Sequence, residues 1–272
     1  MSNLPLVIDP DQLDNILSTE NILLVDMCKA EQYAKGHIAG AVYLDYSLII
    51  SGEKPVMGRL PEITKLNHAL SSIGLNKDSH VIAYDDEGGG KAARLIWTLH
   101  SLGHNNASIL DGGLISWANE GHPLSTEPVV ATPSDFQSEI TEDYLAHRQY
   151  IIEHLEDDKV ALLDARSIQE YTGEKAFATR GGHIPGAIRY EWTDVMDKNH
   201  NMRLLADDVI QAQLNELGLT PDKEIICYCH THHRSALSYL VLRKLGYPNV
   251  KGYPSSWSDW GNQADTPIET GS

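Results

Sequence analysis

The chain carries one pattern of segments twice, about 140 residues apart, and this repeat constrains its fold more than any other feature. Each copy opens with an apolar run that ends in an aspartate, Asp26 in the first copy and Asp164 in the second. A Gly-His-Ile turn, a second apolar run, a polar loop and a helix-length segment ending in Leu-Gly then follow in both copies. A tryptophan, Trp117 or Trp257, lies near the end of each copy. Because solenoid repeats have periods of roughly 20 to 50 residues, the sequence predicts a duplicated domain.

Short apolar runs alternate with helix-length segments in both copies. The runs are bounded by polar residues and rich in β-branched residues, which is typical of buried parallel strands. The predicted strands are Ile22–Asp26, Val81–Asp85, Ala161–Asp164 and Ile225–Tyr228, and the helical patterns are Ala92–Leu102 and Ser235–Leu245. Strand-loop-helix repetition predicts an α/β fold of two tandem domains, each with a mainly parallel central sheet flanked by helices.

The boundary between the two copies is expected where prolines discourage regular structure. The stretch Ser125–Pro133 contains two prolines and lies between the repeats. We therefore assign residues 1–124 to an N-terminal domain, residues 125–137 to a linker and residues 138–272 to a C-terminal domain.

Charge and composition exclude several classes of protein. The 21 Lys and Arg against 38 Asp and Glu give a formal net charge of −17, which fits neither nucleic acid nor an anionic membrane as partner. No apolar run approaches the ~20 residues of a membrane span, and the start of the chain shows no signal-peptide pattern. We expect a cytoplasmic protein. With three cysteines and no export signal, a disulfide framework is not expected.

The segment from Cys229 to Arg234 has the features of an anion-binding loop with a reactive thiol. Cys229 stands at the carboxyl end of a predicted strand and directly before a predicted helix, the place where α/β sheets bind ligands. The backbone N–H groups of the loop and the helix N-terminus favour an anion there and stabilise a thiolate. Arg234 adds a permanent positive charge, and three histidines offer further donors. We therefore predict Cys229 to be a nucleophile.

The Cys-x4-Arg spacing of this loop resembles the active loop of the rhodanese (thiosulfate sulfurtransferase) family. The resemblance extends over almost the whole chain, through the segments around Asp164, Glu170 and His183 and the ending Ser255–Asn262. The loop Cys-His-Thr-His-His-Arg is most similar to the Cys-Gln-Thr-His-His-Arg loop of certain bacterial tandem rhodaneses. It differs from the basic loop of the vertebrate enzymes and from the Cys-Gly-rich loop of mercaptopyruvate sulfurtransferases.

The resemblance implies sulfur transfer by covalent catalysis in two half-reactions, with a persulfide on Cys229 as intermediate. The donor would be a small anion, thiosulfate, and the acceptor would be cyanide in an assay, and a thiol or a protein in the cell. No cofactor and no metal are expected, and we expect a monomer. The residues expected to bind substrate are His230, Thr231, His232, His233, Arg234 and Ser235, with Glu170, Arg166 and Trp192 at the border. Glu170 and Arg166 are candidates to pair with each other.

The first copy has lost the cysteine. Asp85 stands at the matching strand end, followed by two further acids and the run Gly88–Lys91. A carboxylate forms no persulfide, so the N-terminal domain is predicted to be catalytically silent. In the tandem rhodaneses the silent domain helps to wall the cleft, and the resemblance implies the same here. The glycine run lacks the hydroxyl residue of a phosphate loop, since Ala92 takes that position.

Several residues have more than one interpretation. Cys227 is either a second thiol that resolves a persulfide or a core residue, and core packing is favoured. No chemical role is assigned to Cys28. The loop histidines and cysteines together suggest a metal site, but so many candidates within so few residues cannot all reach one ion. His37 and His183 recur in both copies and favour a structural role, while Trp192 either lines the cleft or packs in the core.

Three rival functions remain. A cysteine phosphatase uses the same residue types but a Cys-x5-Arg loop, one residue longer than this one. A sulfur- or metal-binding protein without catalysis is the second rival. Within the sulfurtransferases, 3-mercaptopyruvate is the alternative donor. Its carboxylate would need cationic contacts, for which Arg166, Arg180 and Arg189 are candidates.

Overall fold

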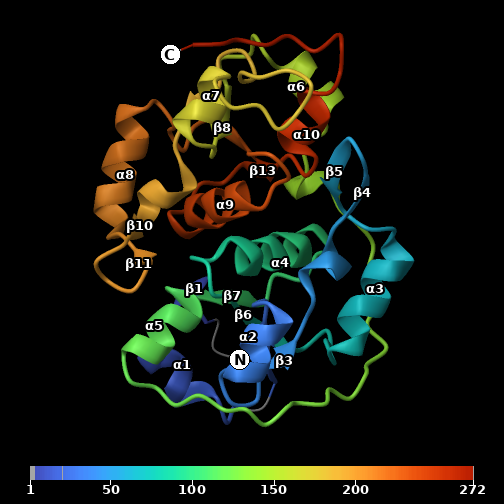
Figure 1. Cartoon of the computed structure of the whole chain (residues 1–272), viewed down its shortest axis with the longest axis vertical. Coiled ribbons are helices and arrows are strands. Elements are labelled where there is room, and N and C mark those ends of the chain that lie inside the picture. The colour runs from blue at the N-terminus through green and yellow to red at the C-terminus, as the bar shows by residue number, and fades with distance from the viewer. Residues whose placement is uncertain (1–3, 20, 272) are drawn as a thin grey trace. The chain divides into compact units, whose positions relative to one another are not determined.

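A computed structural model describes residues 4–19 and 21–271. The chain forms two compact units, and each unit takes one short segment from the other half of the sequence. Unit 1 consists of Met1–Ile49, Pro61–Thr141 and Met196–Leu204, and unit 2 consists of Ile50–Leu60, Glu142–Val195 and Leu205–Ser272. Each unit is an α/β structure around one parallel sheet (Figure 1).

Unit 1 is built on a parallel sheet of five strands in the order β1-β7-β6-β2-β3. The strands are β1 (Val7–Ile8), β2 (Ile22–Asp26), β3 (Val42–Tyr43), β6 (His80–Tyr84) and β7 (Ala107–Leu110). The helices are α1 (Pro10–Ile16), α2 (Ala30–Lys35), η1 (Tyr46–Ile49), α3 (Ile63–Ser72), α4 (Gly90–Ser101) and α5 (Gly113–Asn119). The hairpin of β10 (Met196–Asp197) and β11 (Arg203–Leu204) completes this unit.

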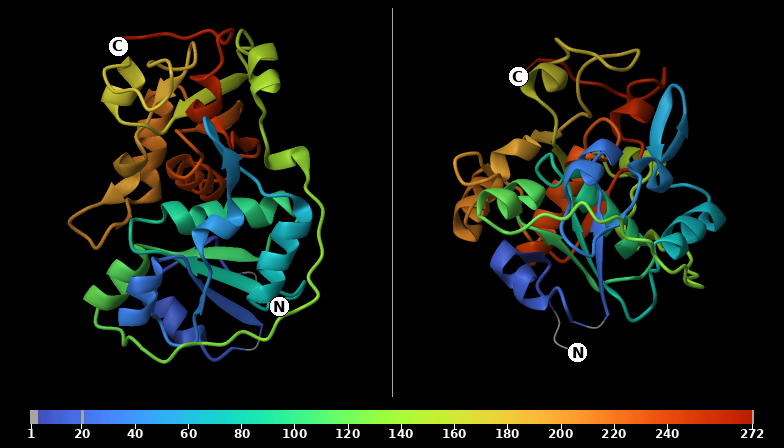
Figure 2. Two further views of the ribbon diagram at one scale, coloured as in Figure 1. Left: turned by 45° about the vertical axis from the view of Figure 1, so that its right-hand side comes forward. Right: turned by 60° about the horizontal axis from the view of Figure 1, so that its bottom comes forward.

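Unit 2 repeats this plan with a parallel sheet of four strands in the order β13-β12-β8-β9. The strands are β8 (Val160–Asp164), β9 (Ile188–Arg189), β12 (Glu224–Tyr228) and β13 (Val250–Gly252). The helices are η2 (Glu142–Tyr144), α6 (Arg148–Glu153), α7 (Ile168–Thr172), η3 (Trp192–Val195), α8 (Asp207–Glu216), α9 (Arg234–Lys244) and α10 (Ser256–Trp260). The hairpin of β4 (Ser51–Glu53) and β5 (Val56–Arg59) belongs to this unit and contacts α10 (Figures 1 and 2).

The predicted elements are confirmed to within two residues at their ends. β2 has the predicted bounds, and β6, β8 and β12 each begin one residue before the predicted start. β6 ends at Tyr84, so Asp85 lies just beyond the strand, as Cys229 does beyond β12. The helix predicted from Ala92 begins at Gly90, and the helix predicted from Ser235 begins at Arg234.

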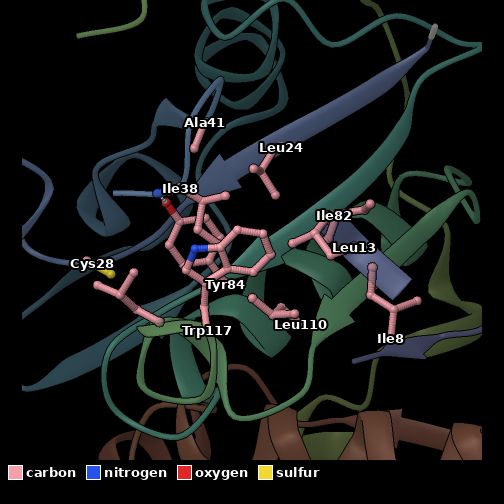
Figure 3. Close-up of a cluster of buried hydrophobic side chains, with 11 residues drawn as sticks. Ile8, Leu13, Leu24, Cys28, Ile38, Ala41, Ile82, Tyr84, Leu110 and Trp117 are labelled. Atoms are coloured by element: carbon pink, nitrogen blue, oxygen red, sulfur yellow. Dashed lines mark hydrogen bonds between the residues drawn. The ribbon is translucent and has the colours of Figure 1, made fainter. Parts of the chain in front are cut away.

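The two units share details of side-chain packing that explain the repeated residues. In unit 1 the hydroxyl of Tyr84 accepts a hydrogen bond from the N–H of Ile38 at 3.1 Å, inside a core that includes Trp117 (Figure 3). In unit 2 the hydroxyl of Tyr228 accepts the equivalent bond from Ile184 at 3.2 Å. These tyrosines lie at the ends of equivalent central strands, and each ties its strand to the turn after the repeated histidine.

The repeated histidines are held by stacking and by backbone bonds. The ring of His37 stacks on Tyr33 with centroids 3.8 Å apart, and the ring of His183 stacks on Tyr171 at 3.6 Å. In both cases Nδ1 of the histidine bonds the carbonyl of the stacked tyrosine. Trp117 and Trp257, which also recur, are each 1% exposed in their cores. The same contacts in both copies support the structural interpretation of these residues.

Over residues 4–19 and 21–271, the helices are all too short or too polar to span a membrane.

Candidate active site

The candidate site is the loop between β12 and α9 in unit 2. Cys229 follows the last residue of β12, and Arg234 is the first residue of α9. The side chain of Cys229 is only 1% exposed, so its sulfur lies inside the loop rather than on the surface. The strand end, the tight loop and the helix start therefore place one thiol where backbone N–H groups converge.

The N-terminus of α10 gives this loop its orientation. The N–H of Trp257 donates to the carbonyl of Cys229 at 3.1 Å, and the N–H of Ser258 donates to the carbonyl of His230 at 2.9 Å. Because a peptide unit is planar with N–H and C=O pointing in opposite directions, an outward carbonyl of His230 turns the N–H of Thr231 inward. The first turn of α10 thus orients the donors of the loop.

Ser256 closes the same loop and was not predicted as a site residue. Its Oγ accepts hydrogen bonds from the backbone N–H groups of Cys229 and His232, both at 3.2 Å, and donates to the carbonyl of Tyr253 at 2.7 Å. Ser256 is fully buried. The sequence showed it only within the ending Ser255–Asn262, and no local pattern reveals a contact across 27 positions of the chain.

The sulfur of Cys229 is surrounded by donors and by one permanent positive charge. Burial alone raises the pKa of a thiol, because the thiolate loses its hydration. The charge of Arg234, the hydroxyl of Ser235 and the N–H groups of Ser235 and Thr231 oppose burial and lower the pKa of the Cys229 thiol to about 7. A large share of this thiol is therefore ionised at neutral pH, which is the reactive form.

Arg234 is fixed by Glu170. The two guanidinium nitrogens donate to the two carboxylate oxygens at 2.6 and 2.8 Å, a bidentate pair. Burial raises the pKa of Glu170, but the bonds and charge of Arg234 outweigh it and bring the pKa of this carboxyl to about 2. Glu170 also completes the capping box of α7, where Ser167 donates its hydroxyl to the same carboxylate at 3.0 Å. Helix capping thus aims the carboxylate that holds Arg234.

His232 supports the serine that contacts the sulfur. The Nδ1 atom of His232 lies 2.8 Å from Oγ of Ser235, and both side chains are fully buried. When Ser235 donates its hydroxyl proton to the thiolate of Cys229, its oxygen accepts from Nδ1–H of His232. His232 has φ of +53°, a left-handed conformation that costs a non-glycine residue about 1–2 kcal/mol. The bonds to Ser235 and Ser256 hold it there.

The other two histidines of the loop face different neighbours. The ring of His230 lies 5.9 Å from the ring of Phe177, and the ring of His233 lies 6.1 Å from that of Trp192. Burial and the charge of Arg234 lower the pKa of His230, so it is neutral at pH 7. Within the part of the chain that the structure describes, no group of three or more His, Cys, Asp or Glu side chains is arranged to hold a metal ion.

Arg166 forms its hydrogen bonds with residues outside the Cys229 loop. It donates to Asp164 through Nε and Nη2, and Nη2 also donates to the carbonyl of Gly182 at 2.8 Å. Its guanidinium lies over the ring of Trp257, 4.4 Å from the centroid, and the residue is 1% exposed. The expected pairing of Arg166 with Glu170 is therefore wrong, because Asp164 is two residues away on the strand end and Arg234 takes Glu170.

The remaining cysteines are buried and poorly suited to ionise. Cys227 lies on β12 with no exposure, and burial together with the thiolate of Cys229 raises its pKa. Cys28 is 3% exposed, and burial and the charge of Asp26 raise its pKa strongly. A neutral thiol is a weak nucleophile, so these positions support core packing.

The equivalent loop of unit 1 is filled by its own side chain. The carboxylate of Asp85 accepts hydrogen bonds from four backbone N–H groups, two to each oxygen. The donors, at 2.8 to 3.0 Å, are Glu87, Gly89, Lys91 and Ala92. Asp85 is 1% exposed. The loop therefore keeps the inward N–H groups of an anion-binding site, but the carboxylate of Asp85 takes the place of a bound anion.

The fold and this loop define a member of the rhodanese-like family. A family profile of the rhodanese-like domain matches the chain twice, at residues 9–120 and 147–263. The chain belongs to this family and contains two such domains, which confirms the family and fold class expected from the sequence.

The most informative relatives are full-length sulfurtransferases. The chain is similar to a thiosulfate sulfurtransferase of Azotobacter vinelandii, with 44% identity over 98% of each chain, and to one of Pseudomonas aeruginosa, with 42% identity over the same share. A 3-mercaptopyruvate sulfurtransferase of Escherichia coli is 30% identical over 88% of this chain and 85% of that one. The solved anaerobic ergothioneine biosynthesis enzyme from Chlorobium limicola shares the fold, with a TM-score of 0.88 at 22% identity, over 98% of this chain and 70% of that chain.

Proposed function

We propose that this protein is a thiosulfate sulfurtransferase that carries sulfur as a persulfide on Cys229. The observation that carries this proposal is the thiol of Cys229, buried in a loop whose N–H groups of Thr231 and Ser235 face the sulfur, beside the charge of Arg234. A site of this kind stabilises a sulfur anion before and after transfer. The names of two relatives above 40% identity support thiosulfate as the donor.

The reaction follows from these contacts in two steps. The thiolate of Cys229 attacks the outer sulfur of thiosulfate, a new S–S bond forms, and sulfite leaves with the electron pair of the old one. The terminal sulfur of the persulfide then takes the place of the anion among the donors of the loop. An acceptor, cyanide or a thiolate, attacks this outer sulfur, and Cys229 returns as a thiolate.

The surrounding residues divide into those that touch the sulfur and those that support them. Thr231, Ser235 and Arg234 act on the sulfur itself, and we assign substrate contact also to His230 and His233 on the same loop. Glu170 positions Arg234, and His232 positions Ser235. Trp192 borders the loop through His233. Arg166 pairs with Asp164 and lies over the ring of Trp257, whose backbone N–H donates to the carbonyl of Cys229.

The partners of three arginines argue against 3-mercaptopyruvate as the preferred donor. Arg166 is paired with Asp164, and Arg180 donates to the carbonyls of Trp260 and Thr266. Arg189 lies 3.5 Å from Glu191 and 3.9 Å from Asp194. The arginines expected to hold the carboxylate of mercaptopyruvate are thus engaged within the protein. Comparing kcat/KM for the two donors tests the choice, and we expect thiosulfate to be higher.

Unit 1 is proposed to be catalytically silent, because Asp85 occupies the position of the nucleophile and fills the loop. We further propose that the sulfur acceptor is a thiol or a protein and that the protein is a monomer. Size-exclusion chromatography with light scattering measures the oligomeric state.

Mass spectrometry of the intact protein after incubation with thiosulfate tests the persulfide directly. We expect one added sulfur atom per chain, lost again on addition of cyanide. Cys229→Ala should abolish the gain, whereas the matched variant Cys227→Ala, two positions earlier in the chain, should keep it. Sulfur gain by the Cys229→Ala protein would refute the proposal, and loss in Cys227→Ala alone would move the chemistry to that thiol.

A further inference from the structure

The hairpin β4–β5 lies in the first half of the sequence but belongs to the unit that holds the active loop. In Figures 1 and 2 it lies beside α10, the helix that orients that loop. Gly58, near the end of β5, is buried in this contact and has φ of +85°. A buried glycine with positive φ in a strand often marks a place where another backbone approaches closely.

That backbone is the active loop itself. A Cβ atom built on Gly58 would lie 2.7 Å from the carbonyl oxygen of Thr231 and 2.8 Å from its Cβ. It would also lie 2.6 Å from the carbonyl oxygen of Pro254, just before α10. All three distances are shorter than a side chain tolerates, and two of the atoms are backbone. Only glycine lets β5 pack against the loop at this point.

Thr231 is the residue of the loop where such packing matters most. Its N–H donates to the sulfur of Cys229, and its carbonyl faces Gly58 on the other side of the residue. The next N–H, that of His232, is bonded to Ser256. The carbonyls of Cys229 and His230 are hydrogen-bonded to α10, whereas the carbonyl of Thr231, one peptide further along, packs against Gly58.

Ser258 joins the hairpin and the loop. Its backbone N–H donates to the carbonyl of His230 at 2.9 Å, while its Oγ accepts from the N–H of Met57 at 3.0 Å and bonds the carbonyl of Met57 at 2.8 Å. Met57, the residue before Gly58, is therefore hydrogen-bonded to Ser258. Ser258 in turn bonds the carbonyl of His230 and so turns the N–H of Thr231 inward. A displacement of β5 would be passed to the loop through Ser258 as well as through the contact of Gly58 with Thr231.

We propose that Gly58 is a positioning residue for sulfur transfer, which keeps the N–H of Thr231 aimed at Cys229 by leaving room for the Thr231 carbonyl. The inference rests on the proposed function of Cys229 as sulfur carrier. It assigns a role in the chemistry to a residue without a side chain, in a segment that the sequence places in the first repeat.

The test compares Gly58→Ala with Gly246→Ala. Gly246 follows α9 in the same unit and has φ of +83°, and a Cβ atom at this position would meet no other atom within 4 Å. The control therefore carries the same backbone strain without the contact.

The first readout is the rate of alkylation of Cys229 by iodoacetamide as a function of pH. A weakened N–H bond to the thiolate should raise the midpoint in Gly58→Ala by about one pH unit, a tenfold change in the ionisation equilibrium. Gly246→Ala should keep the midpoint of the unchanged protein.

The second readout is the rate of persulfide formation with thiosulfate, followed by mass spectrometry. We expect Gly58→Ala to load sulfur about fivefold more slowly at pH 7, because a pKa raised from about 7 to about 8 lowers the thiolate share from about one half to about one tenth. Ser258→Ala removes the side-chain hydrogen bonds to Met57 without adding an atom, should shift both readouts in the same direction, and provides the test if Gly58→Ala does not fold.

The outcomes separate the two proposals. If the unchanged protein gains no sulfur from thiosulfate, the proposed function fails, while the alkylation midpoints still report on Gly58. If sulfur loads normally but Gly58→Ala and Ser258→Ala both keep the midpoint of the unchanged protein, the positioning role is overturned. Equal shifts in Gly58→Ala and Gly246→Ala would also overturn it, because backbone strain alone would then explain the effect.

Discussion

The carboxylate of Glu170 accepts two hydrogen bonds from the guanidinium of Arg234, at 2.6 and 2.8 Å. Arg234 begins α9, so its charge lies at the positive end of a helix, where a cation is otherwise unfavourable. Glu170 offsets this cost and fixes the cation beside the sulfur of Cys229. The pair therefore links the start of one helix, α7, to the thiolate at the start of another.

Glu170→Gln should weaken both stability and sulfur transfer. The neutral amide no longer balances Arg234, and breaking a buried ion pair costs about 3 kcal/mol, which partial exposure of Arg234 reduces to about 2 kcal/mol. Urea denaturation measures the loss, and thiosulfate loading should slow because Arg234 is no longer fixed. Gln169→Ala, at an exposed position on the same helix, is the matched control and should change neither quantity.

The reactivity of Cys229 should rise with pH around a midpoint of about 7. Below the midpoint the thiol is protonated and unreactive, and above it the thiolate attacks, so alkylation and sulfur loading increase as pH rises and then level off. Arg234→Gln removes the charge that favours the thiolate and should move the midpoint upward by about 1–3 units. A midpoint unchanged in Arg234→Gln would show that the hydrogen-bond donors of the loop hold the thiolate without the charge of Arg234.

Ser235 should lower the pKa of Cys229 directly, and His232 should lower it through Ser235. Ser235→Ala removes the hydroxyl donor and should raise the pKa of Cys229, as seen in the pH profile of alkylation. His232→Ala should shift the profile in the same direction but less, because the hydroxyl stays while its support is lost. Asparagine tolerates positive φ and offers an N–H near the position of Nδ1, so His232→Asn should restore the profile. A profile that stays shifted in His232→Asn would mean that the imidazole itself is required.

Asp85→Ala should destabilise the protein without changing its sulfur stoichiometry. The substitution leaves four backbone N–H groups without their acceptor, and we expect a loss of about 3 kcal/mol after water enters the loop. Urea denaturation gives the stability, and mass spectrometry after thiosulfate should still show one added sulfur atom. A second sulfur on this variant would contradict the assignment of Cys229 as the sole carrier.

Much of the site was predictable because its signals are local. The strand before Cys229, the helix after it and the spacing to Arg234 are adjacent in the sequence, and the first copy shows the same register with Asp85. The partners of the charged residues were not predictable. Arg166 was expected to pair with Glu170, and the structure pairs it with Asp164, since spacing along a chain does not say which of two carboxylates faces a guanidinium.

The sequence by itself determined the duplicated α/β architecture, the strand-end position of Cys229 and the replacement of that cysteine by Asp85. These follow from hydrophobic periodicity and from residue types within short segments, where the backbone has few alternatives. Only the tertiary structure decided which way the peptides of the active loop point. That orientation comes from Ser256, Ser258 and Gly58, which lie far from Cys229 in the chain, and whose effect depends on three-dimensional contacts that no local pattern encodes.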